Sequence, residues 1–345
     1  MSTRKLNSLT YSILDLATVV EGKSIGDTFK RSVDLARHAD EWGYERYWFA
    51  EHHNMISVAS SATSLLIGHI ADKTSRIRVG SGGIMLPNHS PLVIAEQFGT
   101  LATLYPDRID LGLGRAPGTD QLTAMALRGE RFNAAQDFPS EVRKLQQYMS
   151  ADNSHAKVRA IPGEGTDVPI WILGSSTDSA HLAAAYGLPY AFASHFAPQQ
   201  FLSAISIYRN NFKPSAQLQK PYVMACVNTV VADSDQEAER LSTSLKQLFM
   251  GIVTGKRQLL QPPVDDMELI WNQMEEEAVY QMLAVSFIGG VDKVRDDLTS
   301  FLAQTQVDEV MATSHIYDHQ ARLRSYELFS AILKGDGSTF GTPDS

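Results

Sequence analysis

The chain carries two adjacent histidines, His52 and His53, directly after the apolar segment that ends in Ala50 and Glu51. Imidazole can both give and take a proton near neutral pH, so the pair is a candidate for general acid–base catalysis. Side chains alternate between the two faces of a strand, so only His52 shares the face of Ala50. The alternative is a structural surface pair. We expect no metal site, because H-E-x-x-H and a cysteine cluster are both missing.

A second group of polar residues could hold an anion. Three serines lie between the apolar segment 168–173 and a helical pattern, namely Ser175, Ser176 and Ser179. A helix N-terminus attracts phosphate through its free N–H groups and its dipole. Arg115, at the end of a neighbouring predicted strand, could bind the same phosphate with its guanidinium group. The serines could instead be helix caps only, but with Arg115 they favour an anion site.

Glycines at the ends of two other predicted strands could let the backbone approach a flat ligand. Gly82 and Gly83 lie in the segment GSGGIMLP at residues 80–87, where a β-bulge is the alternative explanation. The segment GLGRAPG at residues 112–118 resembles a dinucleotide-binding fingerprint only superficially. Its third glycine is one place late, and Pro117 stands where the helix should begin, so we expect no Rossmann site.

These residues need a scaffold that brings the ends of strands together. Short apolar segments, each followed by a helical pattern, occur at residues 9–14, 46–51, 76–85, 108–114, 168–173, 189–193, 222–231 and 307–312. Eight alternating strands and helices predict an α/β fold of the (β/α)8, or TIM-barrel, type rather than a six-stranded doubly wound sheet. Active sites of such barrels lie at the carboxyl ends of the strands. His195 and His315 follow the sixth and eighth segments, so they are further pocket candidates.

Two connections are too long for simple barrel loops. They run over about residues 115–167 and 232–306, and insertions of that size usually carry function. We expect one barrel domain over residues 1–334 that includes both insertions. The tail at 335–345 is rich in Gly, Ser and Thr, which predicts a flexible segment.

Composition excludes several classes of protein. The 345 residues include 39 acidic and 30 basic side chains, and a net charge of −9 argues against a nucleic-acid partner. Residues 179–208 lack charged side chains, but Gly, Pro and Gln interrupt them too often for a membrane span. The single cysteine, Cys226, cannot form an intrachain disulfide, and no apolar signal segment follows the N-terminus. The sequence therefore predicts a cytoplasmic protein.

Four segments resemble the bacterial luciferase-like flavin-dependent monooxygenases, which are (β/α)8 barrels that use reduced FMN and oxygen. They are YWFAEHH at 47–53, VGSGGIMLP at 79–87, DRIDLGLGR at 107–115 and LGSSTDS at 173–179. The resemblance extends over about residues 9–333. It is greatest to the single-gene, uncharacterised, alkanal-monooxygenase-like branch, whose members carry SGGIMLPNHSPLVIAEQ, as this chain does at 81–97.

This resemblance implies roles for individual residues. It places His52 at the catalytic position and a non-proline cis peptide bond between Gly82 and Gly83 beneath the isoalloxazine ring. It assigns the FMN phosphate to four residues, Arg115, Ser175, Ser176 and Ser179. The chain departs from luciferase itself at two of the aligned positions: Gly114 replaces a reactive cysteine and Ser175 replaces a glutamate. Light emission from a long-chain aldehyde is therefore not implied, whereas the flavin site is.

The implied activity is an FMNH2- and O2-dependent monooxygenation of a small, largely apolar organic substrate. Since no second nucleotide site is evident, a separate NAD(P)H:flavin reductase should supply the reduced flavin. The helices expected at 60–73 and 91–104 are rich in small apolar residues and pair subunits in this family, which predicts a homodimer. Two alternatives are F420-dependent hydride transfer on the same barrel and a non-catalytic flavin-binding protein.

Overall fold

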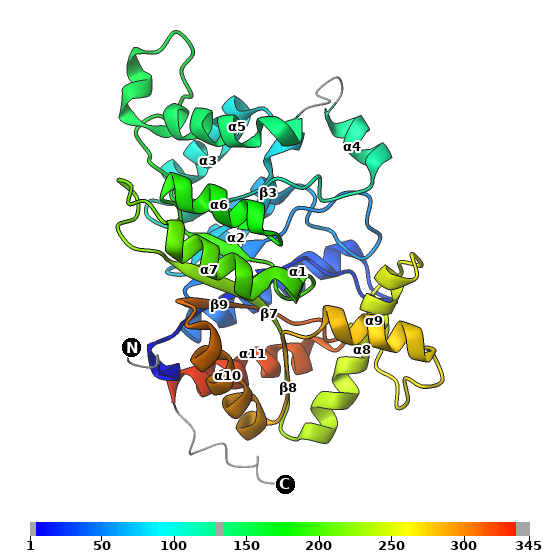
Figure 1. Cartoon of the computed structure of the whole chain (residues 1–345). Coiled ribbons are helices and arrows are strands. Elements are labelled where there is room, and N and C mark those ends of the chain that lie inside the picture. The colour runs from blue at the N-terminus through cyan, green and yellow to red at the C-terminus, as the bar shows by residue number, and fades with distance from the viewer. Residues whose placement is uncertain (1–4, 129–133, 336–345) are drawn as a thin grey trace.

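Parallel strands form a closed barrel at the centre of the molecule, and helices surround it (Figure 1). This computed structural model describes residues 5–128 and 134–335. The barrel order is β1-β2-β3-β4-β5-β6-β7-β9, and β9 pairs with β1 to close it. The strands are β1 (Thr10–Asp15), β2 (Arg46–Phe49), β3 (Arg78–Met85), β4 (Ile109–Gly114), β5 (Ile170–Gly174), β6 (Tyr190–Phe192), β7 (Val223–Val231) and β9 (Glu309–Thr313). Every predicted strand overlaps one of these, so the (β/α)8 fold is confirmed.

One further strand, β8 (Ser286–Gly289), was not predicted. It pairs in parallel with the second half of β7, from Asn228 to Val231. It has only four residues and is followed directly by Gly290, so its composition carries little strand signal. The stretch 232–306 is therefore not a plain insertion, because β8 joins the sheet within it.

Helices follow the strands around the outside of the barrel. Those that pack around it are α1 (Ile25–Glu41), α2 (Thr63–Ala71), α3 (Pro91–Leu104), α6 (Thr177–Tyr186), α7 (Phe201–Asn211), α10 (Val291–Thr305) and α11 (His319–Lys334). The long connections add α4 (Gln121–Arg128), α5 (Ala134–Met149), α8 (Asp235–Val253) and α9 (Gln273–Met282). Short 3-10 turns lie at η1 (Leu6–Ser8), η2 (Leu86–Asn88), η3 (Ala151–His155) and η4 (Pro198–Gln200). Residues 336–345 of the predicted flexible tail lie outside the described residues.

Strand alternation divides the core into two parts. Outward side chains such as Tyr47 and Phe49 pack against the helices. The inward side chains form a separate cluster inside the barrel: Leu14, Trp48, Ala50, Trp171, Ala191, Met224, Cys226 and Met311. Burial raises the pKa of the Cys226 thiol, so this cysteine behaves as a small apolar residue of the barrel interior. Trp48 and Ala50 thus share the inward face, as alternation predicts.

Buried ion pairs fill the barrel at the amino-terminal ends of its strands. Arg46 Nη1 lies 2.7 Å from Asp110 Oδ2, and Arg46 Nε lies 3.2 Å from Glu309 Oε1. Arg78 pairs with the other Asp110 oxygen at 2.6 Å, and Tyr222 donates to Glu309 at 2.9 Å. Both carboxylates are fully buried and each has several partners. We call these residues the closed end of the barrel.

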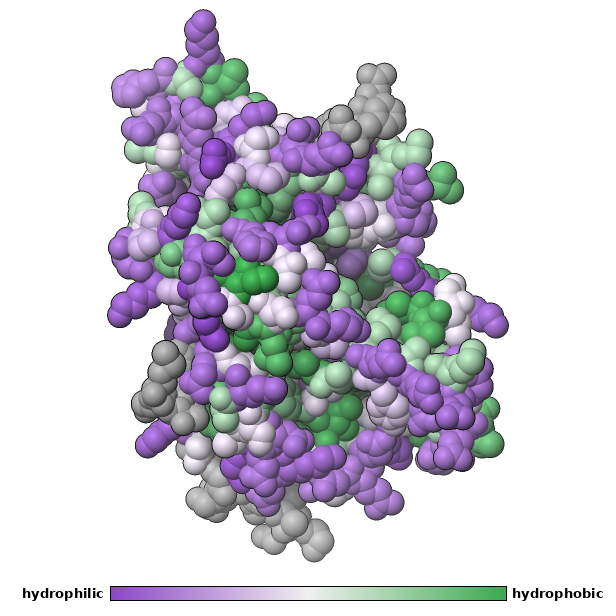
Figure 2. Space-filling model, in the orientation of Figure 1, coloured by the Kyte–Doolittle hydropathy of each residue, from purple (hydrophilic) through white to green (hydrophobic). Residues whose placement is uncertain are grey.

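The surface is mostly hydrophilic on the face seen in Figure 2. Apolar patches occur over the α8 and α9 region, where Ile252, Leu269 and Met274 are partly or largely exposed. Within the described part of the chain, no helix has the length and apolar character to cross a bilayer.

Candidate functional site

A cavity of about 410 Å³ opens at the carboxyl ends of the strands. This size is typical of small-molecule sites, which are largely apolar with a few convergent polar groups. Among the residues that line it are six of the seven predicted site residues: His52, Gly82, Arg115, Ser175, Ser176 and Ser179. The seventh, Gly83, does not line the cavity. The structure thus brings residues from four separate strand ends to one place, opposite the closed end.

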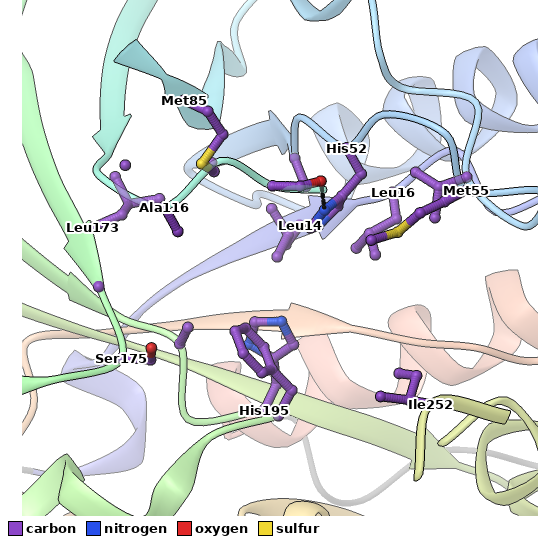
Figure 3. Close-up of a pocket in the computed structure, with 18 of the residues that line it drawn as sticks. Leu14, Leu16, His52, Met55, Met85, Ala116, Leu173, Ser175, His195 and Ile252 are labelled. Atoms are coloured by element: carbon purple, nitrogen blue, oxygen red, sulfur yellow. Dashed lines mark hydrogen bonds between the residues drawn. The ribbon is translucent and has the colours of Figure 1, made fainter. Parts of the chain in front are cut away.

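His52 reaches the cavity from the loop that follows β2 (Figure 3). Its Nδ1 lies 3.1 Å from the carbonyl oxygen of Gly118. A carbonyl can only accept a hydrogen bond, so Nδ1 carries the hydrogen and, in the neutral ring, Nε2 keeps its lone pair. Burial lowers the pKa of His52, although the Gly118 bond and the Glu51 charge oppose that effect. The neutral side chain can therefore accept a proton at Nε2.

His53 turns away from the cavity, as the alternation predicts. Its Nε2 lies 2.8 Å from Glu51 Oε1, and His89 Nε2 lies 2.8 Å from the same oxygen. The Met85 N–H donates to Glu51 Oε2 at 3.1 Å. Burial would raise the pKa of Glu51, but the hydrogen bonds from His53, His89 and Met85 lower it to about 2. This carboxylate ties the segments after β2 and β3 together behind His52.

Two more histidines face the same cavity, as their positions after β6 and β9 suggest. Burial lowers the pKa of His195 to about 3, and burial together with the Arg322 charge lowers that of His315 to about 4. Both rings are therefore neutral near pH 7. His315 Nδ1 lies 3.3 Å from Thr18 Oγ1, whereas the buried His195 Nδ1 has no hydrogen-bond partner among the described residues. The site thus contains a buried polar atom that is not satisfied by the protein.

The Gly82–Gly83 peptide bond is cis, as the resemblance implied. A Cβ at Gly82 would lie 2.6 Å from Leu14 Cδ1, and a Cβ at Gly83 would lie 2.6 Å from the Gly112 carbonyl oxygen. The pairing of β3 with β4 also shifts register between Ser81 and Ile84, so the bulge is present. Close packing against the β4 backbone thus requires glycine at position 83, whereas Gly82 adjoins the Leu14 side chain and leaves its backbone open to the cavity.

The predicted anion site lies where β4 and β5 end. Ser176 is the N-cap of α6, but its side chain makes no capping bond, so capping does not account for it. Arg115 Nη2 lies 3.2 Å from Asp178 Oδ2, and about half of the Arg115 side chain is exposed. Ser179 differs, because its hydroxyl donates to the Ser176 carbonyl at 2.7 Å and contacts the Tyr190 hydroxyl at 2.9 Å. All four residues line the cavity, so the phosphate site stays a prediction, with the Ser179 hydroxyl already bonded within its own loop.

One wall of the cavity comes from residues that the sequence analysis did not identify. Phe249 and Ile252 of α8, Met282 of α9 and Arg257 of the intervening loop all line it. They belong to the stretch 232–306, where we expected function from length alone. The amphipathic pattern of α8 marks an apolar face, but no sequence pattern says that this face covers a cavity.

A barrel whose cavity lies at the carboxyl ends of the strands, with a few polar side chains among apolar ones, is typical of TIM-barrel enzymes. Comparison with known proteins narrows the class, since residues 10–309 match the model of the luciferase-like monooxygenase family. A luciferase-like monooxygenase of Escherichia coli (strain K12) is 53% identical over 321 residues, covering 93% of this chain and 96% of that protein. The uncharacterised protein YvbT of Bacillus subtilis (strain 168) is 52% identical, covering 97% of this chain and 99% of its own length.

Solved structures agree with the sequence relatives. The crystal structure of apo-MsnO8 matches with a TM-score of 0.85 at 35% identity, covering 94% of this chain and 98% of that one. The chain therefore belongs to the luciferase-like monooxygenase family and is a flavin-dependent monooxygenase.

Proposed function

We propose that the protein uses reduced FMN and oxygen to monooxygenate a small, largely apolar organic substrate. The observation that carries this proposal is the order of groups along one cavity. Ser175 lies at one end and His52 lies with His195 in the middle (Figure 3), and Arg115 and Ser176 line the same cavity. A phosphate at the first position would place a flat ring system beside Gly82 and His52.

Each group has a separate task. Arg115 and the two serines bind the phosphate by charge-assisted hydrogen bonds and fix the position of the ring. Reduced FMN, when bound, supplies the electrons that activate oxygen. His52 Nε2 accepts or returns a proton at the reacting centre, and Gly118 holds the ring in the required tautomer. The apolar walls exclude water from the reaction.

The fold alone does not choose between FMN and the deazaflavin F420. The oxygenating constituent of 3,6-diketocamphane monooxygenase, solved in complex with FMN, has a TM-score of 0.70 at 17% identity over 95% of this chain. An F420-dependent secondary alcohol dehydrogenase has a TM-score of 0.64 at 13% identity over 93% of it. Our choice of FMN rests instead on the family membership.

Oxygen consumption tests the choice directly. The protein is mixed with reduced FMN or reduced F420 under air, and consumption above the cofactor-only control is recorded during a substrate screen followed by mass spectrometry. We expect substrate-dependent consumption and a product heavier by one oxygen atom with FMN only. Substrate-dependent turnover with F420 alone would favour the hydride-transfer alternative, and no turnover with either would favour a flavin-binding protein.

We propose further that a separate NAD(P)H:flavin reductase supplies the reduced cofactor. A flavin-dependent trigonelline monooxygenase of Acinetobacter baylyi, 21% identical over 64% of this chain, is named as an oxygenase component, which supports a two-component arrangement.

We also propose a homodimer through α2 and α3, where Leu65 and Leu104 are 74% and 63% exposed. Light scattering that gave only a monomer at micromolar concentration would contradict the dimer. A cytoplasmic location stays a prediction, in keeping with the single, buried cysteine.

A further inference from the structure

Arg257 is a cation at the cavity that the flavin site does not use. It lies in the loop between α8 and α9 and lines the cavity beside the apolar wall of Phe249, Ile252 and Met282. The described part of the chain provides no hydrogen bond or ion pair to its guanidinium group. The residues that line the cavity include two arginines, Arg115 and Arg257, and no carboxylate.

The local backbone holds this loop in place. Gly255, at φ +71°, reverses the chain after α8, and a Cβ at Gly251 would lie 3.0 Å from the Lys256 carbonyl oxygen, so the loop packs closely on the helix. Further along, Leu260 pairs with the segment after β1. Its N–H donates to the Val19 carbonyl at 2.9 Å, and its own carbonyl accepts from the Glu21 N–H at 3.0 Å. Arg257 is therefore carried by a loop anchored at both ends.

The two arginines serve different ends of the cavity. Figure 3 shows Ser175, which neighbours Arg115, on one side of His52 and His195, and Ile252 and Met55 on the other. The Arg257 loop adjoins the Ile252 side, because it packs on α8 at Gly251. After the effect of burial, the Arg257 charge further lowers the pKa of His52, so the guanidinium group lies within electrostatic reach of the proposed reacting centre.

We propose that Arg257 binds the carboxylate of the substrate, which is therefore an apolar organic acid rather than a neutral compound. The apolar part of the acid packs against Met55, Ile252 and Met282. Its carboxylate accepts paired hydrogen bonds from the Arg257 guanidinium group. A neutral apolar substrate in this compartment would displace water from the Arg257 cation without giving it a partner. This inference deepens the proposed function and rests on it, since it treats the Ile252 side as the substrate compartment.

Ligand binding tests the inference without turnover. Hexanoate and its neutral analogue hexanamide are titrated by ligand-observed NMR into the protein, both alone and saturated with FMN. We expect hexanoate to bind roughly five- to tenfold more tightly than hexanamide. The preference is modest because Arg257 is exposed without a ligand, so the ion pair between its guanidinium group and the carboxylate is only partly buried. Raising the salt concentration to about 1 M, where the Debye length is ~3 Å, should reduce this preference.

Matched variants identify the group responsible. R257Q should abolish the preference for hexanoate and leave FMN affinity unchanged, whereas K256Q removes the same charge from the adjacent residue, which does not line the cavity, and should change neither. Equal binding of hexanoate and hexanamide to the wild type would overturn the inference, as would a preference that R257Q keeps. A matching loss of FMN affinity in R257Q would also overturn it, because Arg257 would then serve the cofactor. If FMN itself fails to bind, the proposed function fails, while hexanoate binding to the protein alone still tests Arg257.

Discussion

Both ends of the barrel contain buried polar side chains, but the two sets differ in how completely they are hydrogen-bonded. At the closed end, Asp110 and Glu309 are fully buried, and every charge faces an opposite charge or a donor within 3.3 Å. At the open end, His195 Nδ1 is buried with no hydrogen-bond partner among the described residues, and His52 contacts the Gly118 carbonyl oxygen through Nδ1. The closed end is a saturated network, whereas the open end has polar groups left for a ligand.

His195 Nδ1 is one of several buried side-chain atoms without a partner among the described residues, but others, such as Thr229 Oγ1 and Trp271 Nε1, do not line the cavity. Buried polar groups are normally satisfied, so a group that the protein itself leaves unsatisfied indicates a missing ligand or water. Perturbed pKa values do not make this distinction, because Glu51 is strongly shifted although it only ties two loops together. An unsatisfied polar group marks a candidate site only where it also lines a cavity, as His195 does.

The largest effect is expected for His52→Ala. General acid–base groups typically contribute about 10²- to 10⁴-fold, so the proton transfer that accompanies reoxidation of the flavin should slow by that factor. FMN affinity should stay nearly unchanged, because the phosphate contacts lie on other strands. Stopped-flow reoxidation of bound reduced FMN reports the step even without the native substrate. A lowered melting temperature with unchanged reoxidation would instead mark His52 as a structural residue.

Arg46→Met should break the closed end. It leaves Glu309 without its cation and Asp110 with Arg78 only, and removal of one partner from a buried pair costs about 3–5 kcal/mol of unfolding free energy. Urea unfolding measures this loss, and FMN affinity of the folded protein should not change. The exposed pair Arg159–Glu164 offers the control, where Arg159→Met should have little effect. A comparable loss in both variants would refute the contrast.

Arg115→Ala should weaken FMN binding by roughly ten- to over a hundredfold, because a charge-assisted hydrogen bond contributes about 1.5–3 kcal/mol. Ser176→Ala should have a smaller effect in the same direction. Calorimetric titrations with FMN and with riboflavin separate the phosphate from the ring. If Arg115→Ala weakened both ligands equally, the phosphate assignment would be wrong.

His195 should make the open end sensitive to acid. Its pKa is about 3 in the folded protein and near 6.5 when unfolded, so between these values the unfolded chain binds a proton that the folded chain does not. Stability should therefore fall as the pH drops below about 6.5, by up to about 1.4 kcal/mol per pH unit from this group. His195→Phe should make the fall shallower in unfolding curves from pH 7 to 4.

The smallest effect is expected for Asp178→Asn. The Asp178 carboxylate lies 3.2 Å from Arg115 and would compete with a phosphate for the same guanidinium group. Exposed pairs are worth only about 0–1 kcal/mol, so FMN should bind up to about fivefold more tightly in this variant. Riboflavin affinity should not change. Weaker FMN binding would mean that Asp178 positions Arg115 rather than competing for it.

The sequence predicted much of the fold and six residues that line the cavity, whereas their roles in cofactor binding and catalysis stay predictions. Hydrophobic periodicity located eight strands, and alternation along β2 correctly placed His52 toward the cavity and His53 away from it. The strand β8 was missed because four residues next to glycines carry too little pattern. The cavity wall that comes from the stretch 232–306 was missed for another reason. Phe249, Ile252 and Arg257 lie near the strand ends only because of tertiary packing. No sequence pattern predicts the hydrogen bond from the Ser179 hydroxyl to the carbonyl oxygen of Ser176 in the same loop.

Hydrogen–deuterium exchange with and without FMN tests the contrast between the two ends most directly. The account predicts slower exchange on FMN addition in the segments after β2, β4 and β5, which contain His52, Arg115 and Ser176. It predicts no change at the amino-terminal ends of β2 and β9, around Arg46 and Glu309. Protection at those closed-end residues, or no protection around Arg115 and Ser176 at saturating FMN, would contradict the account.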